Sequence, residues 1–336
     1  MDQAAEESGG VINAVLLGAL AGSGKLPIGD AAFEAAIREG GKAIDTNLAA
    51  FAFGRGHARG ELEQAVREHR KRQSAGQGVE DLIERARQEF PASSLDIVEE
   101  GIRRLATYQD RRYAALYLDR LRSFDPALVR DVARHLAVRM SFEDVIRVAQ
   151  AKTSRERLGR VRAEVRARPN EPIELTEHFK PGNEEIAAIL PPWAARWLMA
   201  RPKFHISMHI RSTTIWGFAR LRFLASLRWW RPYTHRFIEE QAEIEGWLQA
   251  IRSAQSLSPD FAREIAELAR LIKGYGDTYA RGLGNYRRIS VEIVAPALAG
   301  RLAPSKAADA VANARVAALA DPDGDALSRT LAAIAA

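Results

Sequence analysis

The sequence has no cysteine among its 336 residues. Disulfide bonds, thiolate-bound zinc and a cysteine-ligated iron–sulfur cluster are therefore excluded for this chain, and the absence fits a reducing compartment. It also has no apolar run long enough to span a membrane, because Arg220, Arg222 and Arg228 interrupt the most apolar stretch, residues 214–230. The first residues are acidic and lack the basic start of a signal peptide. We expect a cytoplasmic protein with no membrane partner.

Alternating strand patterns are scarce, and apolar residues recur mostly at helical spacing. This predicts an all-α chain, folded as an irregular multi-helix bundle. A proline-rich stretch, residues 168–182, is the clearest predicted boundary, and residues 73–78 are a predicted linker. We therefore expect three parts: residues 1–72, 79–168 and 182–336.

Several helix limits follow from capping and proline signals. We expect a helix over residues 93–123 and another that opens with a capping box at Ser141 and runs to about residue 166. Further helices are predicted from about Ser207, Thr234 and Ser258, and two small ones over residues 304–336.

Residues 186–238 have no acidic side chain but hold nine of the 49 lysines and arginines and five of the six tryptophans. Two interpretations stay open. The segment is either a surface for an anion or partner, or a face whose arginines pair with acids such as Glu239, Glu240, Glu243 and Glu245. In the first interpretation the surface residues are Arg220, Arg222, Arg228 and Arg231.

His205 and His209 have the i,i+4 spacing of metal ligands on a helix. No third ligand is evident nearby, so we expect packed or hydrogen-bonded histidines and no metal site.

The stretch from Lys273 to Gly282 is a second candidate site. One interpretation is a helix end at Gly274 followed by a helix capped by Asp277. The other is a ligand loop in which Lys273, Tyr275 and Arg281 converge on a substrate or anion, while Asp277 orients Arg281.

The N-terminal motifs resemble the end of the γ-type domain of 2-oxoacid:ferredoxin oxidoreductases. The resemblance covers the run from Ala4 to Pro27, the helix from Ala32 to Arg38, and Asn47 to Gly54. It implies that residues 1–72 are the remnant of an α/β domain. The glycine-rich start of that domain does not precede residue 4. We expect either a truncated fragment or a separate polypeptide that supplies the missing part.

The rest of the chain resembles the helical extension of the indolepyruvate branch of this family, the β-type subunit. The motifs are Tyr108–Asp119, Met140–Lys152, Leu227–Arg231 and Lys273–Gly282. The resemblance implies oxidative decarboxylation of an aryl 2-oxoacid with coenzyme A, giving an acyl-CoA, carbon dioxide and reduced ferredoxin. Thiamine diphosphate and iron–sulfur clusters would lie on a partner subunit, with no cofactor on this chain, which would be inactive alone.

The resemblance therefore implies a thiamine-diphosphate and iron–sulfur subunit as the partner, with ferredoxin as a further candidate. The alternative is a non-catalytic basic helical protein that binds nucleic acid or an acidic partner. We do not expect nucleic acid to be the main partner. Salt-dependent binding to DNA or RNA would distinguish the two hypotheses.

Overall fold

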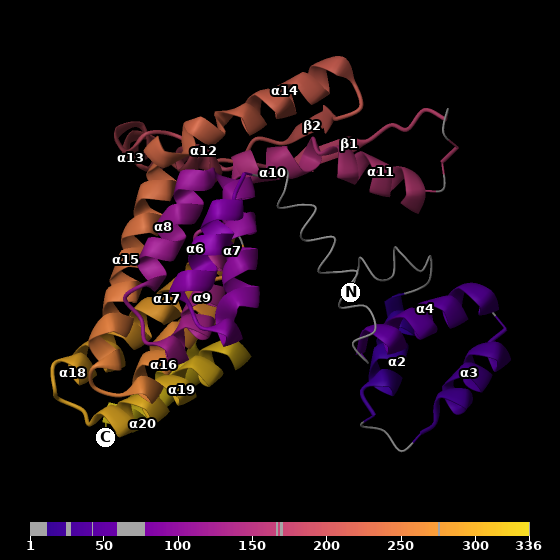
Figure 1. Cartoon of the computed structure of the whole chain (residues 1–336). Helices are drawn as coiled ribbons and strands as arrows, with labels where there is room; N and C mark the ends of the chain where they lie inside the picture. The colour runs from indigo at the N-terminus through magenta and orange to yellow at the C-terminus, as the bar shows by residue number, and fades with distance from the viewer. Residues whose placement is uncertain are drawn as a thin grey trace. The chain divides into compact units, whose positions relative to one another are not determined.

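The computed structural model of the chain describes residues 12–24, 28–41, 43–58, 78–165, 167–168, 171–274 and 276–335. Across these ranges the predicted all-α class is confirmed, with a single two-stranded sheet (Figure 1). No helix within them has the length and apolarity needed to cross a membrane. The chain divides into two compact units, Met1–Gly76 and Gln77–Ala336.

The first unit packs two helices, α2 (Ile12–Gly22) and α4 (Ile44–Ala58), with α3 (Asp30–Glu39) alongside α4. The backbones of α2 and α4 touch, because a Cβ added at Gly18 would lie 2.0 Å from the carbonyl oxygen of Phe51. Arg55 joins α4 to α3 by ion pairs to Asp30 at 3.1 Å and Glu34 at 3.2 Å. Close helix approach and a small apolar core hold this unit together.

One core holds the second unit together, and it is built from both ends of that unit. Its buried residues come from Val79 to Met140 and from Phe237 to Leu331. The predicted division at residues 168–182 therefore falls inside one compact unit, since helices from both predicted parts share the core. The helices of the first part are α6 (Glu80–Glu89), α7 (Leu95–Tyr108), α8 (Arg111–Leu121) and α9 (Pro126–Arg139).

The second part of this core starts with the long helix α15 (His235–Gln255). It packs against α16 (Pro259–Glu267), and α16 in turn packs against α9 and α19 (Pro304–Ala320) (Figure 1). The remaining helices are α17 (Gly276–Ile289), α18 (Ala295–Leu298) and α20 (Asp325–Ala335), with a 3-10 turn η4 (Leu268–Leu271) and a π-helical turn η5 (Ser290–Val294).

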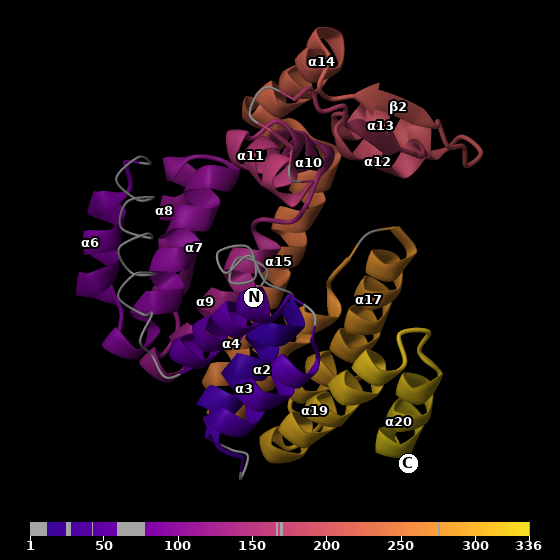
Figure 2. The ribbon, with the colours of Figure 1, turned by 90° about the vertical axis from the view of Figure 1, so that its right-hand side faces the viewer.

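In the middle of the unit, residues 145–233, none of the described residues belongs to this core. Its few buried apolar residues, such as Ile146, Leu221 and Ala225, lie outside the main core. The elements are α10 (Val145–Lys152), α11 (Arg155–Glu164), β1 (Thr176–Phe179), α12 (Asn183–Ala188), α13 (Pro192–Met199), β2 (Met208–Arg211), α14 (Ile215–Ser226) and the 3-10 turns η2 (Leu227–Trp229) and η3 (Arg231–Tyr233). Both views place α10, α12 and α14 near one end of α15, with α19 and α20 toward the other (Figures 1 and 2).

Three predicted helix limits are wrong. The helix over 93–123 breaks after Tyr108, because Asp110 accepts a hydrogen bond from the backbone N–H of Tyr113 at 2.8 Å and starts α8. Ser141 does not cap a helix, since Asp144 caps α10 instead, and that helix ends at Lys152. The helix expected from about Ser207 is preceded by strand β2 and begins only after its cap at Thr214. The predicted starts at Thr234 and Ser258 are confirmed by their capping hydrogen bonds.

Candidate functional site

Arg231, predicted to lie on a charged surface, is fully buried. Its Nε donates to Asp144 Oδ2 at 2.6 Å and its Nη2 to Asp144 Oδ1 at 3.1 Å. Its Nη1 donates to the carbonyl oxygen of Tyr108 at 2.6 Å and to Gln109 Oε1 at 2.9 Å. The guanidinium also lies 4.0 Å from the centroid of the Tyr108 ring. Its donors are therefore used inside the chain, and the surface role predicted for Arg231 is wrong.

We call Arg231, Asp144, Tyr108 and Gln109 the Arg231 cluster. It brings together residues from three of the motifs that carry the family resemblance, residues 108–119, 140–152 and 227–231. It also ties the start of α10 and the turn before α15 to the end of α7. These motifs therefore specify one buried packing arrangement.

The other predicted surface arginines are exposed. Arg220 and Arg222 lie on α14 and Arg228 on η2, and within the described ranges none of the three forms an ion pair. Of the nine cationic residues in 186–238, four do have acidic partners: Lys203 with Glu184, Arg211 with Glu174, Arg231 with Asp144 and Arg236 with Glu240. The pairing interpretation therefore holds for these four residues, although only Arg236 uses one of the acids it named, and the surface interpretation stays a prediction for the exposed arginines.

Large apolar side chains are exposed beside these arginines. On α14, Ile215 is 86% exposed, Trp216 79% and Phe223 65%. Trp216, Arg220 and Phe223 are spaced by four and three residues, so they form one outward stripe of the helix. We call these three residues the outer stripe of α14. Trp193 and Trp197 repeat the pattern on α13, at 72% and 62% exposure.

The inner side of α14 explains why this stripe faces outward. Gly217, Leu221 and Ala225 are the buried positions of the helix, and they pack mainly against α10. Among the described residues of this unit, none covers the opposite side, where Trp216 and Phe223 remain largely exposed. The stripe is therefore free to contact another molecule.

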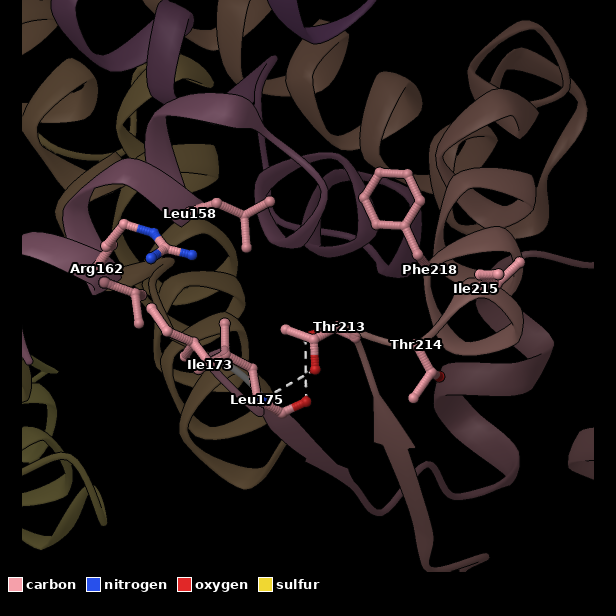
Figure 3. Close-up of a pocket in the computed structure, with 10 residues that line it drawn as sticks. Leu158, Arg162, Ile173, Leu175, Thr213, Thr214, Ile215 and Phe218 are labelled. Carbon is pink, nitrogen blue, oxygen red and sulfur yellow. Dashed lines mark hydrogen bonds between the residues drawn. The ribbon is translucent and has the colours of Figure 1, made fainter. Parts of the chain in front are cut away.

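An apolar hollow of about 450 Å³ lies between α11, residues 173–175 and the start of α14 (Figure 3). Leu158, Ile173, Leu175 and Phe218 form much of its wall. Two of its hydroxyl groups donate within the chain, Ser212 Oγ to the carbonyl oxygen of Leu175 at 3.3 Å and Thr214 Oγ1 to that of Arg211 at 2.8 Å. The lining suits an apolar side chain, and its described residues include no acid, histidine or lysine that could act as a catalyst.

Arg162, at the edge of this hollow, is also engaged. Its Nη1 donates to the carbonyl oxygens of Arg168 at 2.7 Å and Glu171 at 3.0 Å. These bonds fold the chain after α11 back toward the helix.

The stretch from Lys273 to Gly282 does not gather its predicted residues. Lys273 and Asp277 are exposed, and Tyr275 lies outside the described residues. Arg281 Nη1 pairs with Asp323 Oδ1 at 2.8 Å, so its acidic partner comes from the turn before α20 and not from Asp277. Gly274 has a φ of +77°, as a helix-terminating glycine does. The capping interpretation matches only in part: a glycine with positive φ follows the end of η4 at Leu271, but Asp277 lies in the first turn of α17 and does not precede that helix as its cap.

The two histidines do not share a helix. His209 lies in β2 opposite His178 of β1, with ring centroids 4.6 Å apart, and His205 forms an isolated backbone bridge with Gly182. Across the described residues, no group of three histidines or acids has the geometry of a metal site.

Sequence reasoning missed two buried charged groups. Glu177 of β1 binds Lys152 and Arg157, each at 2.5 Å. Arg139 at the end of α9 is 4% exposed and lies between the rings of Trp247 and Tyr286. Both charges lie far along the chain from the groups that surround them, and no local motif marks either.

Comparison with known protein families gives one match. A family of unknown function (DUF6537) matches residues 95–292, more than half of the sequence. The chain belongs to this family. No curated protein and no solved structure matches it. The DUF6537 region runs from the start of α7 into η5, so it includes the Arg231 cluster, the apolar hollow and the outer stripe of α14.

Proposed function

We propose that the chain is a partner-binding subunit or fragment of an indolepyruvate-type 2-oxoacid:ferredoxin oxidoreductase. In this proposal a partner subunit carries thiamine diphosphate and the iron–sulfur clusters, and coenzyme A is the co-substrate. The reaction is oxidative decarboxylation of an aryl 2-oxoacid to an acyl-CoA and carbon dioxide, with two electrons passed to ferredoxin. The present chain provides a docking surface and no catalytic group.

The observation that carries the docking role is the outer stripe of α14. Trp216 and Phe223 leave most of their side chains in contact with water, which costs about 25 cal/mol for each Å² of apolar surface left uncovered. Tryptophan and arginine are the residue types most enriched among the energetically dominant residues of interfaces. Arg220 lies between them without an acidic partner in the described structure, so the matching surface is expected to be acidic.

The reaction class rests on the sequence resemblance. The Arg231 cluster supports applying this resemblance to the present fold, because three of the motifs that carry the resemblance meet in the cluster through buried contacts. The absence of cysteine agrees with a division of labour in which another subunit holds the clusters.

The test uses the full chain and a purified thiamine-diphosphate and iron–sulfur subunit of the indolepyruvate type from the same organism. Sedimentation velocity should detect a complex, and coenzyme-A-dependent reduction of ferredoxin by indolepyruvate should rise when the chain is added. The double variant Trp216→Ser/Phe223→Ser should weaken the complex by about tenfold or more.

Val316→Ser is the matched control, because Val316 is 59% exposed on α19, outside the matched family region. It should leave the complex unchanged. Failure of the wild-type chain to bind, or equal weakening by the control, would contradict the proposal.

A second candidate is binding to single-stranded nucleic acid, which exposed aromatic rings beside arginines also favour. In that case the chain should bind a single-stranded oligonucleotide with an affinity that falls steeply as the salt concentration rises. The double variant Trp216→Ser/Phe223→Ser should lose this binding.

A further inference from the structure

A second hollow, distinct from the apolar one, lies between the C-terminal ends of α10 and α14 and has a volume of about 500 Å³. Its polar lining residues are Gln150, Thr153, Ser154, Arg222, Ser226 and Arg228. We call it the arginine hollow. Among the residues whose side chains the structure describes, no acid lines it, so two positive charges share this cavity without a described negative charge in its walls.

The charge arrangement differs from that of the neighbouring arginines. Arg157 and Arg231, which flank the region, both bind carboxylates of this chain. Arg222 and Arg228 have no such partner within the described residues, and both are exposed. Two like charges facing one cavity repel each other unless an anion lies between them.

The helix ends do not supply that anion. The C-termini of α10 and α14 each contribute a partial charge of about −0.5, which is smaller than the two full positive charges of the arginines. The arginine hollow therefore keeps a net positive potential and attracts an anion.

Further donors are available in the walls. Ser154 Oγ accepts a hydrogen bond from the backbone N–H of Arg157 at 3.2 Å, so its own O–H proton remains for a ligand. Gln150 also lines the hollow, and its side-chain amide carries two N–H donors. By contrast, the hydroxyl groups of Thr153 and Ser226 already donate hydrogen bonds within the chain. Thr153 donates to the carbonyl oxygen of Ala149 at 2.8 Å, and Ser226 donates to that of Phe223 at 2.7 Å.

We propose that the arginine hollow binds the phosphate group of a small molecule. Two guanidinium groups, a hydroxyl and an amide match the several acceptor oxygens of a phosphate, and arginine binds phosphate through paired N–H donors. The volume lies within the range of about 300–1,000 Å³ typical of small-molecule sites. This site does not depend on the proposed oxidoreductase partner, since all its residues belong to one chain.

The test measures binding of inorganic pyrophosphate to the isolated full chain by isothermal titration calorimetry, in a phosphate-free buffer at constant ionic strength. Saturable binding at one site is expected. Arg222→Gln and Arg228→Gln should each weaken it about tenfold, because each removes hydrogen bonds to a charged group. Ser154→Ala should weaken it less. Thermal unfolding of each variant establishes that the fold is retained.

Arg301→Gln is the control, since it removes one exposed positive charge outside the arginine hollow. Unchanged affinity in this control would support the site. Equal weakening in all three arginine variants would show attraction by net charge alone and overturn the proposal. Absence of pyrophosphate binding would also overturn it, including the case in which a single-stranded oligonucleotide binds instead.

Discussion

Arg231 and Asp144 lie 87 residues apart in the chain, yet their side chains form a buried two-point ion pair with bonds of 2.6 Å and 3.1 Å. Asp144 also caps α10, because its Oδ1 accepts the backbone N–H of Arg147 at 2.6 Å. One carboxylate therefore both starts a helix and holds the turn before α15. The thin middle segment is fastened to the main core through this pair.

Removing one partner of this pair should be strongly destabilising. We expect Arg231→Ala to lower the free energy of unfolding by about 3–5 kcal/mol, because it leaves the Asp144 carboxylate without its buried partner. Urea denaturation followed by circular dichroism measures the change. Arg301→Ala, which removes an exposed arginine, should change it by no more than about 0.5 kcal/mol. A loss below about 1 kcal/mol for Arg231→Ala would refute the fastening role.

Glu177 should make the stability of the middle segment depend on pH. Burial alone would raise the pKa of this carboxyl, but the hydrogen bonds and charges of Lys152 and Arg157 outweigh burial and lower it below the ordinary value of 4.5. A group with a depressed folded pKa stabilises the fold fully above its ordinary pKa. That contribution is lost as the pH falls through the folded value.

The corresponding experiment compares the wild-type chain with Glu177→Gln across pH. The wild type should be more stable at pH 7, and the difference should shrink below about pH 4.5 as Glu177 takes up a proton. A difference that stays constant down to the lowest pH at which the chain is folded would rule out this linkage.

The contact between α2 and α4 should not tolerate a side chain at its crossing. A Cβ added at Gly18 would lie 2.0 Å from the Phe51 carbonyl oxygen, and one at Gly54 would lie 2.0 Å from the Val15 carbonyl oxygen. Gly54→Ala should therefore unfold or separate the helices of the first unit, as read by faster amide hydrogen exchange in α2 and α4. Gly246→Ala is the control: no atom lies within 4 Å of the added Cβ on α15, and the change should stabilise by roughly 0.5–1 kcal/mol.

Arg139 offers the opposite kind of test, because its charge is buried without a counter-ion. The Nε, Nη1 and Nη2 atoms have no hydrogen-bond partner at normal geometry in the described structure, and the guanidinium carbon lies 5.3 Å from the Trp247 ring and 5.5 Å from the Tyr286 ring. We expect Arg139→Met to leave the melting temperature unchanged or raise it, since it keeps the stem and removes a desolvated charge. Trp247→Ala should cost about 3–5 kcal/mol. A large loss in Arg139→Met would mean that the ring contacts outweigh the desolvation.

The sequence by itself determined the features that depend on near neighbours. The helical spacing of apolar residues predicted the all-α class. The capping side chains of Thr234 and Ser258, which lie directly before helically spaced apolar residues, predicted where two helices start. The acid-free stretch around the tryptophans was visible as composition, and Gly274 marked a helix end. These signals depend only on residues that are close in the sequence, so they can be recognised without knowing how the helices pack.

Only the tertiary structure decided which charges are buried and which are open. Arg228 and Arg231 are three residues apart in the same basic run, but one lines a hollow and the other is sealed beneath Tyr108. The partners of Arg231, Glu177 and Arg281 come from distant segments, at separations that no helical period encodes. The short strand pair between residues 176 and 211 likewise forms across an intervening pair of helices. Packing of remote segments sets these contacts, because a buried charge is stable only where another part of the chain supplies its counter-charge or hydrogen bonds.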